Sequence, residues 1–231
     1  MQQSKQQFIP VQFVKKGWRF FKQNWQDIYK IIGIASILQL LASYFAGYNL
    51  TNLPELIQMM VNIALQAFSL VLSMNSIKLL LRVVRGRDYE LSELFSLDLK
   101  LFVYVWTMIK VGVIVLAGLV LLIVPGVIWA LKYSMVQFLI IDQEMESTEA
   151  MKVSAQMTEG VRSKLLWFAL LLAGVNILGL LALGLGLLIT IPVTYAANLL
   201  VYLHLLSAVE QGNSNSQVKQ DSTPKIEAAE K

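Results

Sequence analysis

The sequence contains no cysteine and a single histidine, His204. Without cysteine the chain forms no disulfide, and thiolate catalysis and cysteine metal sites are excluded. One histidine cannot supply the paired ligands of an HExxH zinc site. The serine nearest to His204, Ser207, has no acid to orient the pair, and no GxSxG nucleophile elbow occurs. We therefore expect no enzymatic activity, no catalytic or metal site and no cofactor.

Charged residues are also scarce. They make up 15% of the 231 residues, against 56% hydrophobic residues, whereas a soluble domain carries about 25% charge. The charge-free runs cover residues 31–54, 56–77, 111–131 and 165–209, which are 24, 22, 21 and 45 residues long. A hydrocarbon core about 30 Å thick needs roughly 20 apolar helical residues. These runs exclude a soluble globular fold and an outer-membrane barrel, whose strands alternate in polarity.

The sequence predicts an all-α, polytopic membrane helix bundle with six transmembrane helices in three hairpins. The expected spans are residues 28–47, 56–80, 102–124, 126–141, 165–186 and 189–208, in a transmembrane domain over 28–209. The fourth span is only about 24 Å long, so it sits in a thinned region, ends below the surface or continues into a following helix. We expect residues 1–27 to form an amphipathic interfacial segment and the polar residues 210–231 a disordered cytoplasmic tail.

Lysines and arginines gather on one side of the predicted hairpins. Of the 19 in the chain, 17 lie before or at the start of the first span, at or between the facing ends of the second and third, between the fourth and fifth, or in the tail, and the three opposite connections contain none. Positive residues mark cytoplasmic loops, so we expect both termini in the cytoplasm. The net charge of +4 therefore reflects membrane orientation, and no nucleic-acid partner is expected.

Two cytoplasmic segments have amphipathic patterns. In the first, the apolar positions Val14, Trp18, Phe21, Trp25 and Ile28 recur at helical steps, and Lys15, Arg19 and Lys22 repeat the same steps on a neighbouring face. Such a helix lies in the interface with its aromatic side in the acyl boundary. It is either a simple anchor for the first span or a surface for anionic headgroups. The second is a helix over residues 148–160 along the inner face, ended by Gly160.

Lys110 and Lys132 interrupt the third and fourth spans. An ionisable group at such depth is costly unless it reaches the interface, pairs or faces water, so both lysines are candidate site residues. Each ammonium either snorkels toward an interface or faces an interior cleft and attracts an anionic group such as a lipid phosphate. Glu55, at the outer end of the second span, is a possible partner of a snorkelled Lys132.

Prolines and glycines mark the returning spans. Pro54, Pro125 and Pro192 each come just inside the start of such a span, 71 and 67 residues apart. Proline is tolerated there because its missing amide hydrogen is least harmful, and a triplicated hairpin is the alternative explanation. In the fifth span Gly174, Gly179 and Gly184 recur every five residues, which indicates either close helix packing or a flexible transport helix.

The stretch from Val124 to Phe168, beginning VPGVIWALKYSMVQFLIID, resembles an uncharacterised bacterial family of integral membrane proteins. That family, a domain of unknown function, is related to the so-called membrane domain of a glycerophosphoryl diester phosphodiesterase. The positions that carry the resemblance are Pro125, Gly126, Tyr133, Asp142, Glu149, Ala150, Ser154, Gly160 and, in the last span, Tyr202. The resemblance implies a six-helix protein of the bacterial inner membrane and supplies no established activity.

The leading functional prediction is a non-enzymatic scaffold that binds lipids or a protein partner. The expected partners are anionic membrane lipids, and a membrane protein or a second copy of the chain. Lys15, Arg19, Lys22, Lys110 and Lys132 are the candidate lipid-binding residues. A transporter or permease-like component is the alternative, with the two lysines and the glycine-rich fifth span lining a path, and a membrane enzyme is the third.

Overall fold

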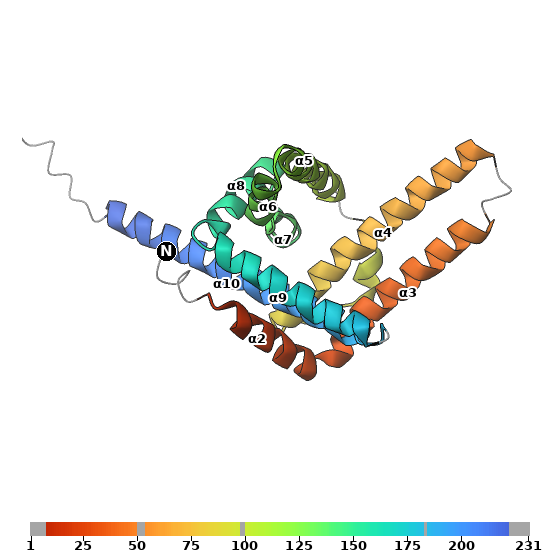
Figure 1. The fold of residues 1–231 in the computed structure, drawn as a ribbon, viewed down its shortest axis with the longest axis horizontal. Helices are drawn as coiled ribbons and strands as arrows, with labels where there is room; N and C mark the ends of the chain where they lie inside the picture. The colour runs from red at the N-terminus through yellow and green to blue at the C-terminus, as the bar shows by residue number, and fades with distance from the viewer. Residues whose placement is uncertain (1–7, 50–53, 98–99, 183, 222–231) are drawn as a thin grey trace, which may run out of the picture.

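The computed structural model describes residues 8–49, 54–97, 100–182 and 184–221, and every regular element in these ranges is a helix (Figure 1). The elements, in chain order, are α2 (Pro10–Gln23), α3 (Trp25–Asn49), α4 (Glu55–Val84), the short 3₁₀ helix η1 (Leu91–Phe95), α5 (Lys100–Leu121), α6 (Ile123–Lys132), α7 (Val136–Gln143), α8 (Ser147–Thr158), α9 (Arg162–Leu181) and α10 (Leu187–Asp221). The predicted all-α fold is confirmed.

Six stretches of helix are long and apolar enough to cross a membrane. They are Trp25–Phe45, Glu55–Val84, Lys100–Leu121, Ile123–Gln143, Arg162–Leu181 and Leu187–Gly212. Each matches one predicted span, so the chain is a multi-pass membrane protein by the length and composition of its helices. Large apolar side chains remain exposed along these helices, as expected for surfaces that meet lipid.

The fourth span is broken into two helices, α6 and α7, by the turn Tyr133–Met135. The break leaves backbone groups without helical partners, and α8 supplies them. The Ser154 hydroxyl donates a hydrogen bond to the Lys132 carbonyl at 2.8 Å and accepts one from the Met135 amide at 3.3 Å. Thr158 donates a second bond to the Lys132 carbonyl at 3.3 Å. The short span therefore continues as a second helix, with its irregular backbone satisfied inside the protein.

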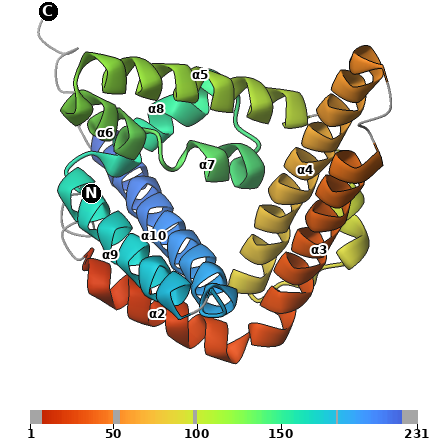
Figure 2. The ribbon, with the colours of Figure 1, turned by 45° about the vertical axis from the view of Figure 1, so that its right-hand side comes forward.

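The amphipathic segment packs against other helices of the protein. Phe13, Gly17 and Phe21 are the buried positions of α2, and α2 lies beside α9 and α10 (Figures 1 and 2). The predicted aromatic face is therefore divided, because Phe21 and Ile28 are buried in protein, whereas Trp18 and Trp25 are 41% and 51% exposed. The physical reason is that α10 offers a competing apolar surface, which the small residue Gly17 allows α2 to approach closely.

The hairpins splay apart. The α3–α4 hairpin projects from the rest of the molecule, and the turn between α9 and α10 lies beside the start of α3 (Figure 2). The Tyr29 hydroxyl donates a hydrogen bond to the Leu188 carbonyl at 3.0 Å. If the hairpins stood upright and parallel to one another, Leu188 would lie level with the far tip of the α3–α4 hairpin. The hydrogen bond from Tyr29 instead places Leu188 beside the start of α3.

The predicted start of the tail at residue 210 differs from the structure, in which α10 continues as a helix to Asp221. A helix that is already formed adds residues without paying the cost of nucleation, so polar residues can extend it past the apolar segment. Residues 222–231 of the predicted disordered tail lie outside the described residues.

Candidate functional site

The exposed side of α2 carries four cations, Lys15, Lys16, Arg19 and Lys22, on a helix fixed to α10 by its opposite side. The Lys16 ammonium lies 4.7 Å from the centre of the Phe13 ring, and the Lys22 ammonium lies 5.1 Å from the Trp18 ring. The second contact holds Lys22 beside an exposed ring that favours the membrane interface, whereas Phe13 is buried against α10. We call these four residues the basic face of α2.

The two intramembrane lysines do not share a site. The Lys110 ammonium lies 3.3 Å from the Ser147 hydroxyl, at the first residue of α8, and 5.3 Å from the Trp106 ring. The Lys132 ammonium lies 5.2 Å from the Tyr133 ring. The backbone carbonyl of Lys132 accepts hydrogen bonds from the last turns of α8. A lone cation at the centre of a bilayer costs about 3 kcal/mol, and both lysines here have polar or aromatic partners within the protein.

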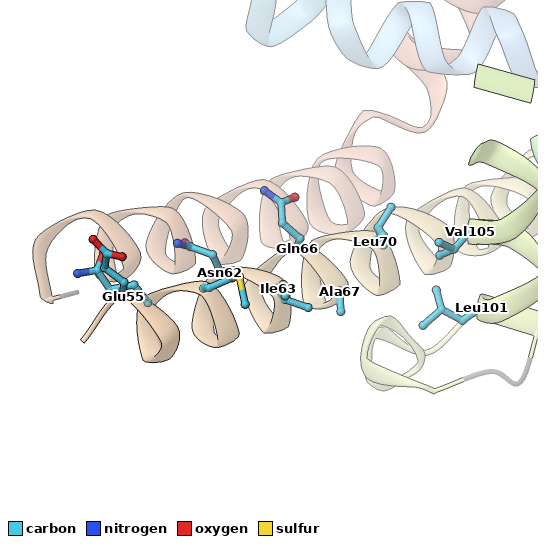
Figure 3. Close-up of a pocket in the computed structure, with 10 residues that line it drawn as sticks. Glu55, Asn62, Ile63, Gln66, Ala67, Leu70, Leu101 and Val105 are labelled. Carbon is cyan, nitrogen blue, oxygen red and sulfur yellow. The ribbon is translucent and has the colours of Figure 1, made fainter. Parts of the chain in front are cut away.

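Glu55 begins α4 at the far tip of the α3–α4 hairpin, well away from α6 (Figures 1 and 2). The prediction that Glu55 is a partner of Lys132 is therefore wrong, because the α3–α4 hairpin projects away from α6 and separates the two residues. Glu55 instead lines a groove of about 620 Å³ along α4, together with Asn62, Gln66 and residues at the start of α5 (Figure 3). Asn62 and Gln66 are exposed. Among the described residues their amides make no hydrogen bond.

A smaller cavity of about 170 Å³ lies between α3, α4 and α10. Its polar lining comes from Ser36, Gln39, Ser73, Ser76 and Tyr195. The transport alternative requires a polar path that includes Lys110 and Lys132, and neither lysine lines this cavity. The three glycines of that alternative also differ in environment, since Gly179 contacts Thr190 and Gly186, Gly174 has open space beside it, and Gly184 occupies a left-handed turn.

A buried polar network joins α4, α7 and α10 at one point. Arg85, the residue after α4, pairs with Asp142 through both guanidinium nitrogens, and the Nη2–Oδ2 distance is 2.6 Å. The hydroxyl of the fully buried Tyr202 donates to the same carboxylate at 2.7 Å. The Asp142 side chain is only 4% exposed, so these three residues form a single charge-assisted unit.

Sequence reasoning placed Asp142 and Tyr202 among the positions of the family resemblance and did not connect them to each other or to Arg85. The three residues are 57 and 60 positions apart along the chain, and no local pattern reports such a contact. The only signal was that a lone aspartate at a span end needs a cation nearby. Lys78, Arg82, Arg85 and Arg87 gather at this end of α4 around a pocket of about 150 Å³.

Two pKa shifts mark this end of the molecule, outside the spans. The hydrogen bonds that Arg85 donates to Asp142 raise the pKa of Arg85 above its ordinary value and keep the guanidinium charged. Burial, with the hydrogen bond to Asp27, raises the pKa of Tyr89 to about 12. Tyr89 therefore stays neutral and donates to Asp27 at 2.9 Å, which ties the loop after α4 to the start of α3.

The remaining candidate structural residues mark helix ends and contacts. Pro54 precedes α4, and Pro125 lies in the first turn of α6, as predicted. Gly160, with a φ of +78°, follows the end of α8, and Glu149 is exposed in the first turn of that helix. Gly126 packs against Leu119 of α5 so closely that an added Cβ would lie 2.5 Å from the leucine Cγ.

Pro192 lies one turn inside α10, further than predicted. Its missing amide hydrogen removes the bond that the Leu188 carbonyl, four residues earlier, would otherwise accept. The Tyr29 hydroxyl donates to that carbonyl instead. The proline therefore creates the acceptor that attaches the start of α3 to the start of α10.

The described residues contain no group of three or more histidine, aspartate or glutamate side chains able to hold a metal ion. Comparison with protein-family models, with curated proteins and with solved structures gives no match. The family resemblance of residues 124–168 therefore stays a prediction, and the function rests on the geometry described above.

Proposed function

We propose that this protein is a non-enzymatic membrane protein that binds anionic lipid headgroups at the cytoplasmic face of a bacterial inner membrane. The basic face of α2 is the observation that carries the proposal. Four cations project from a helix whose other side is held by α10. The exposed Trp18 lies on the same helix, and the exposed Trp25 is the first residue of α3.

The charge and the aromatic residues of α2 support this function together. Anionic headgroups attract juxtamembrane lysines and arginines by about 1 kcal/mol for each residue near the surface. Tryptophans prefer the headgroup level, where the ring is half in the apolar region. Since α2 is already ordered against α10, little conformational entropy remains to be lost on binding lipid.

Lipid selectivity of the purified protein tests the proposal. We expect native mass spectrometry of protein from nanodiscs that contain equal amounts of phosphatidylglycerol and phosphatidylcholine to show preferential retention of phosphatidylglycerol. Replacing Lys15, Lys16, Arg19 and Lys22 with glutamine should lower that preference by up to about a thousandfold, because about 1 kcal/mol is lost for each of four cations and about 1.4 kcal/mol corresponds to a factor of ten.

A double variant provides the control. Lys110→Gln with Lys132→Gln removes two cations that contact Ser147 and Tyr133 within the protein, so we expect it to retain most of the preference. A double variant that loses the preference, with the α2 variant unchanged, would move the lipid site to the intramembrane lysines and contradict the assignment to α2.

The second candidate function is assembly through the groove along α4. Asn62 and Gln66 lie about 10 and 16 Å along α4 from Glu55, at a depth where water is scarce. Each side-chain amide can both donate and accept hydrogen bonds. Asn62 and Gln66 of a second copy of the chain can therefore pair with the same residues of the first copy. Interhelical polar contacts in membranes contribute about 0.6 kcal/mol each.

Cysteine crosslinking in the native, cysteine-free background tests the assembly. We expect Asn62→Cys to form a disulfide-linked dimer in membranes under mild oxidation. Met60→Cys is the matched control, because Met60 is 62% exposed but lies two residues away, on the opposite side of α4. Equal dimer formation by the two variants would show random collision and contradict the groove as the interface.

A further inference from the structure

Helix α2 follows α10 in the antiparallel direction along most of the apolar part of α10. Near one end, the rings of Phe13 and His204 have their centres 5.1 Å apart. In the middle, a Cβ added to Gly17 would lie 2.8 Å from the Cβ of Ala197. Just beyond the other end, Tyr29 donates to the Leu188 carbonyl at 3.0 Å. The two helices therefore share one depth in any membrane.

The cations of α2 indicate how deep in the membrane α2 and α10 lie. Ala197 lies about 15 Å along α10 from Leu187, which is the midpoint of a hydrocarbon core about 30 Å thick. If α10 stood upright in the membrane, Gly17 and its neighbours Lys15, Lys16 and Arg19 would lie near the bilayer centre. These three side chains are exposed, so the cost given above for one intramembrane cation would apply to each of them.

The α9–α10 hairpin, which packs against α2, also carries exposed apolar side chains. Trp167, Leu170, Ile177, Leu178, Leu181 and Leu185 of the α9–α10 hairpin are between 53% and 73% exposed. An apolar side on α9 and on the turn to α10, together with a charged side on α2, fits an assembly lying in the plane of the interface.

We infer that the α9–α10 hairpin does not cross the membrane but lies along its lysine-bearing face. The exposed side chains of the hairpin enter the acyl chains of that leaflet. Helix α2, which runs alongside α9 and α10 (Figure 2), then lies at headgroup level. The bilayer leaflet itself is the partner of this surface. Without these two crossings, both termini still lie on the same side of the membrane. The turn between α9 and α10 contains no lysine or arginine, so its position does not change the number of positive residues on either side.

This inference concerns membrane topology and does not depend on a preference for anionic lipid. Crosslinking tests it in native membranes with the double variant Tyr29→Cys and Leu188→Cys. A short bis-maleimide should join the two cysteines in most chains, detected by mass spectrometry of the linked peptides. In an upright hairpin these positions lie at opposite membrane surfaces, about 30 Å apart, and no link forms.

Two further pairs of cysteine substitutions serve as controls. Lys30→Cys with Leu188→Cys keeps the Tyr29 hydroxyl bond, and we expect it to link as well. Tyr29→Cys with Glu55→Cys spans the length of the α3–α4 hairpin and should stay at background. Failure of both Leu188 pairs to link, while each cysteine reacts alone, would overturn the inference, and so would a link found only between two chains.

Sidedness gives an independent measurement. In sealed vesicles, an impermeant maleimide applied on the side where Glu55→Cys reacts should leave Leu185→Cys unmodified until detergent is added. Labelling of Leu185→Cys from that side, as strong as that of Glu55→Cys, would overturn the inference. The lipid proposal would stand in that case, because it is tested separately by lipid retention.

Discussion

Replacing Asp142 with alanine is expected to lower the free energy of unfolding by about 3 kcal/mol. The change leaves the Arg85 guanidinium and the buried Tyr202 hydroxyl without their shared acceptor. Removing one partner of a buried ion pair costs about 3–5 kcal/mol. Because Arg85 is 26% exposed, water compensates in part, and the lower end of that range applies.

The effect is measured by reversible unfolding of the purified protein in detergent, with two controls. Glu93→Ala breaks the more exposed Arg82–Glu93 pair, which has a separation of 2.5 Å, and should cost less than about 1 kcal/mol. Asp142→Leu combined with Arg85→Met removes both charges and should recover most of the loss. If Asp142→Ala were as mild as Glu93→Ala, the network would not hold α4, α7 and α10 together.

The network also shows which parts of the fold could be predicted. Apolar runs located all six candidate spans, although the fourth was shorter than a bilayer, and Pro54 and Gly160 marked real helix boundaries, since these are local properties of the chain. The Arg85–Asp142 pair joins residues that only the tertiary fold brings together. Local patterns carry no information on such contacts.

The amphipathic segment illustrates a second limit. Helical periodicity reported correctly that α2 has an apolar side and a basic side. It could not report whether lipid or protein covers the apolar side, because both are equally favourable for a phenylalanine such as Phe13 or Phe21. The small residue Gly17 was the available signal, since small residues mark close contacts between membrane helices. The same limit applies to α9 and α10, whose composition fits either an upright or an in-plane hairpin.

The contact between α9 and α10 leads to the second large effect, which we expect for Gly179→Leu. A Cβ at this position would lie 2.6 Å from the Thr190 hydroxyl oxygen and 3.1 Å from the Gly186 carbonyl carbon. The Gly186 backbone cannot rotate away as a side chain can, so the two helices must separate. Overpacking of this kind costs about 1–3 kcal/mol, and we expect the upper end because backbone meets backbone.

Gly174→Leu adds the same side chain to the same helix at a position with open space around it. Helix propensity favours leucine over glycine by somewhat less than about 1 kcal/mol, so this variant should unfold at equal or higher denaturant concentration than the parent protein. The pair therefore separates close packing from helix flexibility, the two explanations of the glycine spacing. Equal destabilisation by both substitutions would favour a helix that must flex, because a packing contact exists at Gly179 but not at Gly174.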